Sequence, residues 1–66
     1  MTITVNGRER VTREDLTIQQ LLEDLGLAPA HVVVELNRHI LAQDQFSRIL
    51  LKTGDMLEIV QFVGGG

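Results

Sequence analysis

The chain has 66 residues, 44% of them hydrophobic, which is enough for one small globular domain near the lower size limit for a single core. Six lysine and arginine residues against nine aspartate and glutamate residues give a net charge of -3, which argues against nucleic acid as a partner because phosphate binding depends on cationic side chains. The chain has no cysteine, which excludes disulfides and thiolate metal sites.

The first residues predict a β-hairpin. Residues 1–5 alternate apolar and polar side chains, the Asn-Gly pair at residues 6–7 suits a two-residue turn, and residues 8–11 return as the second strand. Three arginines fall on or just after the returning strand: Arg8, Arg10 and Arg13. We interpret them as a solvated strand face, and a docking patch for an acidic partner is the alternative.

A helix is predicted to begin after Thr17. Thr17 and Gln20 have the spacing of a capping box, in which each side chain bonds to the backbone of the other residue. One apolar stripe follows at helical spacing: Ile18, Leu21, Leu22 and Leu25. Gly26 can adopt the left-handed C-terminal cap and Pro29 prevents continuation, so the helix should end near Leu25.

The second half of the chain predicts strands and irregular connections. The β-branched run at residues 31–36 is expected to form a strand, followed by a turn at 37–39 and a short strand at 40–41. Residues 42–51 have mixed periodicity and are expected to form an irregular or short helical connection. Its apolar members should close the edge of the core: Phe46, Ile49 and Leu50. After a turn at residues 52–55, residues 56–60 form the last predicted strand.

This order of elements predicts an α+β fold of the β-grasp (ubiquitin-like) type, with a mixed sheet of four to five strands packed on one main helix. An amphipathic helix of this kind can bury its apolar stripe only against a sheet. The last strand is apolar on both faces, so we expect it to be central in the sheet and parallel to the first strand. The predicted core is Ile3, Val5, Leu21, Leu22, Leu25, Val33 and Ile59.

Other sites are not expected. Glu23 and Asp24 project away from the apolar stripe, and we interpret them as a solvated helix face rather than a pair for acid–base catalysis. His31 and His39 have no cysteine and no carboxylate at ligand spacing, so no metal site is expected. No segment is apolar and long enough to span a membrane and no secretion signal is recognisable, so we expect a cytoplasmic protein without membrane contact.

The glycines at the end of the sequence are the candidate site. We expect a domain at residues 1–62 and a flexible tail at residues 63–66, because glycines do not pack and lose the most entropy on ordering. Extended, this tail would reach roughly 13 Å, enough to enter a narrow channel in another protein. A glycine carboxylate is unreactive until it is activated, for example by ATP as an acyl-adenylate, and its carbonyl is then unhindered. A frayed linker is the alternative interpretation.

In this hypothesis Gly64, Gly65 and Gly66 enter the active sites of partners, and Gly66 is the residue that is modified. Phe62 and Val63 lie where the sheet should end and the tail begin, so we expect them to supply apolar docking contacts.

Three segments carry a family resemblance: residues 32–37 (VVVELN), residues 53–60 (TGDMLEIV) and residues 62–66 (FVGGG). Together they resemble the ThiS family of sulfur carrier proteins of thiamine biosynthesis, a ubiquitin-like β-grasp family, and the resemblance covers the whole chain. Many relatives have Val-Pro-Arg after the short strand, where this chain has Leu41-Ala42-Gln43. The departure concerns loop contacts and not the tail.

The resemblance implies a cycle in which this chain is a cosubstrate without an active site or bound cofactor of its own. An E1-like adenylating enzyme of the ThiF type would use ATP and Mg²⁺ to adenylate Gly66. A sulfur relay that begins with a cysteine desulfurase would convert the adenylate to a thiocarboxylate, and a ThiG-like thiazole synthase would accept the sulfur.

Three alternatives stay open. The chain could be a MoaD-like small subunit of molybdopterin synthase, which is a related carrier. It could be a ubiquitin-like protein modifier that is conjugated through Gly66, or a non-covalent interaction module.

Overall fold

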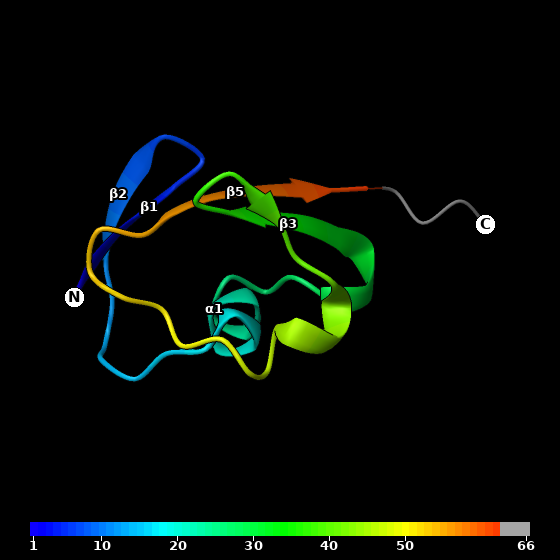
Figure 1. The fold of residues 1–66 in the computed structure, drawn as a ribbon, viewed down its shortest axis with the longest axis horizontal. Coiled ribbons are helices and arrows are strands. Elements are labelled where there is room, and N and C mark those ends of the chain that lie inside the picture. The colour runs from blue at the N-terminus through cyan, green and yellow to red at the C-terminus, as the bar shows by residue number, and fades with distance from the viewer. Residues whose placement is uncertain (63–66) are drawn as a thin grey trace.

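Five strands form one mixed sheet in a computed structural model, which describes residues 1–62 of the chain (Figure 1). The elements are β1 (Thr2–Val5), β2 (Arg8–Val11), α1 (Ile18–Asp24), β3 (Val32–Leu36), β4 (His39–Ile40) and β5 (Met56–Gln61), with short 3₁₀ turns at Pro29–His31 and Gln43–Gln45. The strand order is β2-β1-β5-β3-β4, and α1 lies against one face of the sheet. This confirms the predicted α+β fold of the β-grasp type. The predicted tail at residues 63–66 lies outside the described residues.

The last strand occupies the centre of the sheet, as predicted. β5 pairs in parallel with β1, where Val5 lies opposite Leu57, and antiparallel with β3, where Val34 lies opposite Ile59. Leu57 and Ile59 point toward α1 and are buried, with 1% and 8% of their surface exposed. β3 pairs with β5 from Leu57 to Gln61, whereas β1 pairs only with its first two residues, Met56 and Leu57.

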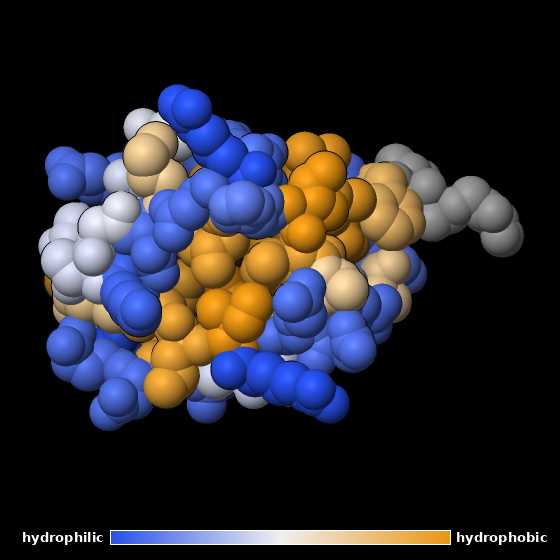
Figure 2. Space-filling model, viewed as in Figure 1, coloured by the Kyte–Doolittle hydropathy of each residue, from blue (hydrophilic) through white to orange (hydrophobic). Residues whose placement is uncertain are grey.

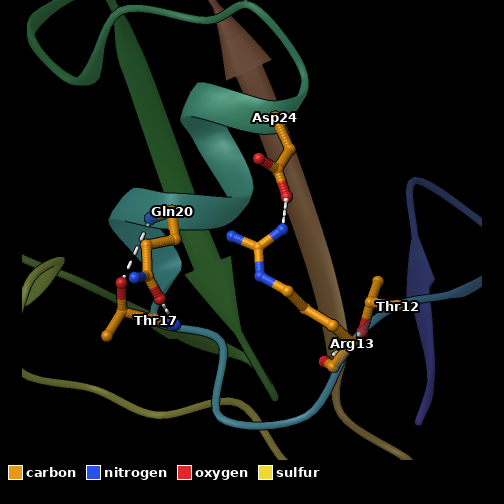
Figure 3. Close-up of polar contacts among 5 residues, drawn as sticks. All are labelled: Thr12, Arg13, Thr17, Gln20 and Asp24. Atoms are coloured by element: carbon orange, nitrogen blue, oxygen red, sulfur yellow. Dashed lines mark hydrogen bonds and ion pairs between the residues drawn. The ribbon is translucent and has the colours of Figure 1, made fainter.

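The helix forms as its capping signal predicts. The Thr17 hydroxyl accepts from the Gln20 N–H at 3.1 Å, and the Gln20 side chain accepts from the Thr17 N–H at 2.9 Å (Figure 3). The helix ends at Asp24 with Leu25 as its C-terminal cap, and Gly26 adopts the expected left-handed conformation with φ of +74°. The helix that carries the apolar stripe is therefore capped at both ends.

Two residues that were expected in the core or at its edge are exposed, and the buried core is larger than the predicted one. The buried hydrophobic residues are Ile3, Val5, Leu16, Ile18, Leu21, Leu22, Val32, Val34, Phe46, Leu51, Leu57 and Ile59. Val33 was expected in this core but is 42% exposed, because the register of β3 turns Val32 and Val34 toward the helix. Leu50 was expected to close the core edge but is 53% exposed, and the next residue, Leu51, is buried instead.

The other predicted core residues are buried: Ile3, Val5, Leu21, Leu22 and Ile59. Leu25 is only partly buried and packs against this core. Phe46 is 2% exposed and Ile49 is partly buried, so the irregular connection does close the core edge as expected. Within residues 1–62, no buried side-chain nitrogen or oxygen lacks a hydrogen-bond partner. No polar or charged residue is buried within that range either, so the described interior is apolar.

Candidate functional site

Phe62 directly follows the central strand and is the last residue that the structure describes. Its N–H donates to the His31 carbonyl at 3.0 Å, and its ring packs edge-on against the His31 imidazole with the ring centres 6.4 Å apart. The side chain nevertheless remains 44% exposed. Phe62 is therefore a fixed and accessible aromatic residue at the end of β5. The other predicted site residues, Val63, Gly64, Gly65 and Gly66, lie outside the described residues.

The Asn6 side chain holds β5 from the side of β1. Its Oδ1 accepts from the Ile59 N–H at 2.7 Å and its Nδ2 donates to the Ile59 carbonyl at 3.1 Å. The Asn6 backbone N–H donates to the Leu57 carbonyl at 2.9 Å. The side-chain amide therefore continues the ladder between β1 and β5 beyond Val5, where β1 itself has ended. The sequence predicted Asn6 only as a turn residue.

A second asparagine, Asn37, holds the start of β5 from the side of β3. Its Oδ1 accepts from the Met56 N–H at 2.9 Å, and its backbone N–H donates to the Met56 carbonyl at 2.8 Å. Its Nδ2 donates to an Asp55 carboxylate oxygen at 3.0 Å. Asn6 and Asn37 both have positive φ angles, of 51° and 48°, in the turns of the two hairpins. β5 is thus held by one asparagine at its first residue, Met56, and by the other at Ile59.

The face of the sheet opposite α1 carries an apolar patch. We define the open-face patch as four residues with exposed side chains: Val33 (42%), Ile40 (74%), Met56 (60%) and Val60 (61%). Val33 lies opposite Val60, whereas Ile40 lies opposite Glu35, and Met56 precedes Glu58 on the same face of β5. Figure 2 shows strongly apolar side chains close to the end of the described chain. Several exposed apolar side chains on one face of a sheet are typical of protein interaction sites.

Two carboxylates interrupt the open-face patch. Glu35 and Glu58 lie directly opposite each other on β3 and β5, and like charges in such a pair destabilise a sheet. They line a shallow hollow of about 380 Å³ together with Asn37, Arg38 and Met56. This hollow lies at the start of β5, and its charged lining consists of two carboxylates and the Arg38 guanidinium.

The residues considered for other sites lie on the solvent-facing surface. Asp24 accepts a hydrogen bond from Arg13 at 2.7 Å, and both side chains are about half exposed (Figure 3). This contact fits the interpretation of Asp24 as part of a solvated helix face. In residues 1–62 no three histidine, cysteine or acidic side chains come close enough to hold a metal ion, and no helix there could cross a membrane.

The sequence and the fold are both similar to those of known proteins. The ThiS family matches residues 2–66. The Bacillus subtilis sulfur carrier protein ThiS is 37% identical over 65 residues, which are 97% of this chain and 98% of that protein. A thiazole synthase of Paramagnetospirillum magneticum is 38% identical over 66 residues, and the chain spans only 20% of its length. The crystal structure of the thiamine biosynthesis protein ThiS from Geobacter metallireducens covers the whole of both chains with 39% identity and a TM-score of 0.83.

Proposed function

Because the chain belongs to the ThiS family, we propose that it is a sulfur carrier for thiamine biosynthesis and that the Gly66 carboxylate carries the sulfur. The main support is the match to a sulfur carrier protein along nearly the full length of both chains. The fold agrees with this assignment, because β5 is the central strand, Asn6 and Asn37 bond to its backbone, and Phe62 and the glycines follow it in the sequence.

The proposed chemistry takes place at the carboxylate and in the active sites of partner enzymes. A ThiF-like adenylating enzyme would transfer AMP from ATP to the Gly66 carboxylate in the presence of Mg²⁺ and release pyrophosphate. A relay that begins with a cysteine desulfurase would then deliver a persulfide, whose outer sulfur displaces AMP to form an acyl disulfide. A thiol such as cysteine would cleave this disulfide by exchange and leave the thiocarboxylate. The chain contributes an unhindered acyl group and no catalytic side chain, so it would act as a cosubstrate in a cytoplasmic cycle.

Docking of the partners is proposed to involve Phe62, Val63 and the open-face patch. Phe62 and Val60 are exposed apolar side chains at the end of β5, and a rigid aromatic residue loses little entropy when it is buried in an interface. A ThiG-like thiazole synthase is one proposed partner. The relative named thiazole synthase supports this pairing, because a stretch similar to the whole of this chain forms part of its longer chain.

The proposal is tested by intact-mass measurement of a chain that ends at Gly66. The chain is incubated with a ThiF-like enzyme, ATP, Mg²⁺ and a cysteine desulfurase with cysteine. The expected product is the chain with one carboxylate oxygen replaced by sulfur, and a variant without Gly66 is the matched control. An unchanged mass together with pyrophosphate release that is equal in both variants would contradict the proposal. Covalent adducts to lysines of other proteins would instead favour a modifier.

A further inference from the structure

The outer edge of the sheet next to the hairpin is open. β2 is the first strand in the sheet order, and all four of its residues are exposed. The Thr12 N–H donates to the Met1 carbonyl at 2.8 Å, which fixes the alternation of bonded pairs along the hairpin. Because bonded and non-bonded pairs alternate in an antiparallel hairpin, Ile3 and Arg10 form a bonded pair, whereas Val11 and Glu9 belong to non-bonded pairs. The backbone N–H and C=O groups of Glu9 and Val11 therefore point away from β1. Within residues 1–62 these groups have no backbone partner, so they form an open strand edge.

A hollow lies beside this edge, on the side of the sheet that faces the helix. Its volume is about 520 Å³, and it is lined by Val5, Asn6, Arg8, Arg10, Leu25 and Leu27. Leu25 and Leu27, at and after the end of α1, are only partly buried. In the orientation of Figure 1, apolar side chains are visible in Figure 2 between the sheet and the helix, with hydrophilic side chains along their border.

The charge of the hollow is positive although the chain as a whole is acidic. Arg8 and Arg10 lie opposite the buried residues Val5 and Ile3, so both project to the helix side, whereas Glu9 projects to the other face. The side-chain ion pair found in residues 1–62 joins Arg13 to Asp24, and within that range neither Arg8 nor Arg10 has an acidic partner. The guanidinium groups of Arg8 and Arg10 therefore lie beside the partly exposed side chains of Leu25 and Leu27.

We propose that this edge binds an extended segment of a partner protein that carries both apolar, strand-forming residues and carboxylates. The segment adds a strand to β2 by bonding to the outward backbone groups of Glu9 and Val11. Its apolar side chains cover Leu25 and Leu27, and its carboxylates pair with the guanidinium groups of Arg8 and Arg10. Neither guanidinium has to leave an existing ion pair within residues 1–62 to do so.

A second copy of the chain is a poorer occupant of the same edge. Pairing two β2 edges would bring the arginines of both copies together, and charged residues on an edge strand oppose that kind of association. The inference goes beyond sulfur transfer. β2 and the open-face patch lie on different parts of the sheet, so a segment bound at β2 would leave Phe62 accessible to the enzymes of the proposed cycle.

The test is an NMR titration of the isotope-labelled full chain with a capped peptide of four valines followed by three aspartates. We expect saturable shifts at the amides of Glu9, Val11, Leu25 and Leu27. A peptide with lysines in place of the aspartates should bind at least about tenfold more weakly, which corresponds to about 1.4 kcal/mol. Equal binding of both peptides, or shifts confined to the open-face patch, would overturn the proposal. Concentration-dependent shifts at Glu9 and Val11 without peptide would assign the edge to a second copy.

Two variants separate the backbone contribution from the charge contribution. Val11→Pro removes one outward N–H, and a proline is compatible with an edge strand at such a position, so the hairpin should form and peptide binding should be lost. The double change Arg8→Glu with Arg10→Glu should also abolish binding. Arg48→Glu with Lys52→Glu makes the same charge change elsewhere on the exposed surface and should leave binding within about twofold. Unchanged binding by the Val11 variant would refute strand addition.

Discussion

Replacing Asn6 by glycine should destabilise the domain although the turn itself keeps its geometry. Glycine adopts the φ of 51° observed at this position without strain, so the change isolates the two side-chain hydrogen bonds to Ile59. Each such bond contributes about 0.5–1.5 kcal/mol, which predicts a loss of about 1–3 kcal/mol. For a domain of this size the whole free energy of unfolding is about 3–10 kcal/mol, so the effect is a large fraction of the total.

The alanine variant at the same position gives a second magnitude. Alanine also lacks the amide, and in addition the left-handed conformation costs it about 1–2 kcal/mol, so Asn6→Ala should lose more stability than Asn6→Gly by roughly that amount. Urea denaturation followed by circular dichroism measures both losses, and amide exchange of Ile59 reports on the lost bond directly. A loss below about 0.5 kcal/mol in Asn6→Gly, with the exchange rate of Ile59 unchanged, would refute the role of Asn6 in holding β5.

Three further variants test the core, the terminus and the docking residue. Leu22→Ala removes a fully buried side chain and should cost about 2–5 kcal/mol in urea denaturation, whereas Val11→Ala, at a position that is 85% exposed, should change stability by less than about 0.5 kcal/mol. Deleting Gly66 or replacing it with tryptophan should abolish adenylation and leave the thermal midpoint unchanged; normal ATP–pyrophosphate exchange with the adenylating enzyme would refute this. Phe62→Ala should weaken binding to the adenylating enzyme and to thiazole synthase by about tenfold or more in calorimetry, and equal affinities would remove Phe62 from the interface.

The order of elements and the central place of β5 could be predicted from the sequence because their signals are local. The Asn-Gly turn, the capping box of Thr17 and Gln20, and the apolar character of the last strand each indicate one element, and few arrangements of those elements bury the helix stripe. The register of β3 had no such signal. Residues 32–34 are three consecutive valines, so only the pairing of Val34 with Ile59 decides which of them faces the helix.

The polar contacts around the candidate site could not be predicted from local sequence patterns either. Asn6 and Asn37 both have the local signature of turn residues, yet their side chains bond to β5, far away along the chain. Leu16 is fully buried but precedes the helix, so the helical spacing did not include it. Long-range contacts of this kind depend on the assembled sheet, whereas Phe62 and the glycines were recognisable from their position after the last strand.

Among the five strands that the structure describes, the one in the middle of the sheet comes last in the chain. Until β5 has emerged from the ribosome, β1 and β3 have no neighbour between them and the apolar side of α1 has only part of its cover. Such pairing between distant parts of a chain is slow to form. A nascent or prematurely terminated chain would therefore expose unpaired strands to chaperones and proteases, and only chains that extend through β5 would escape degradation.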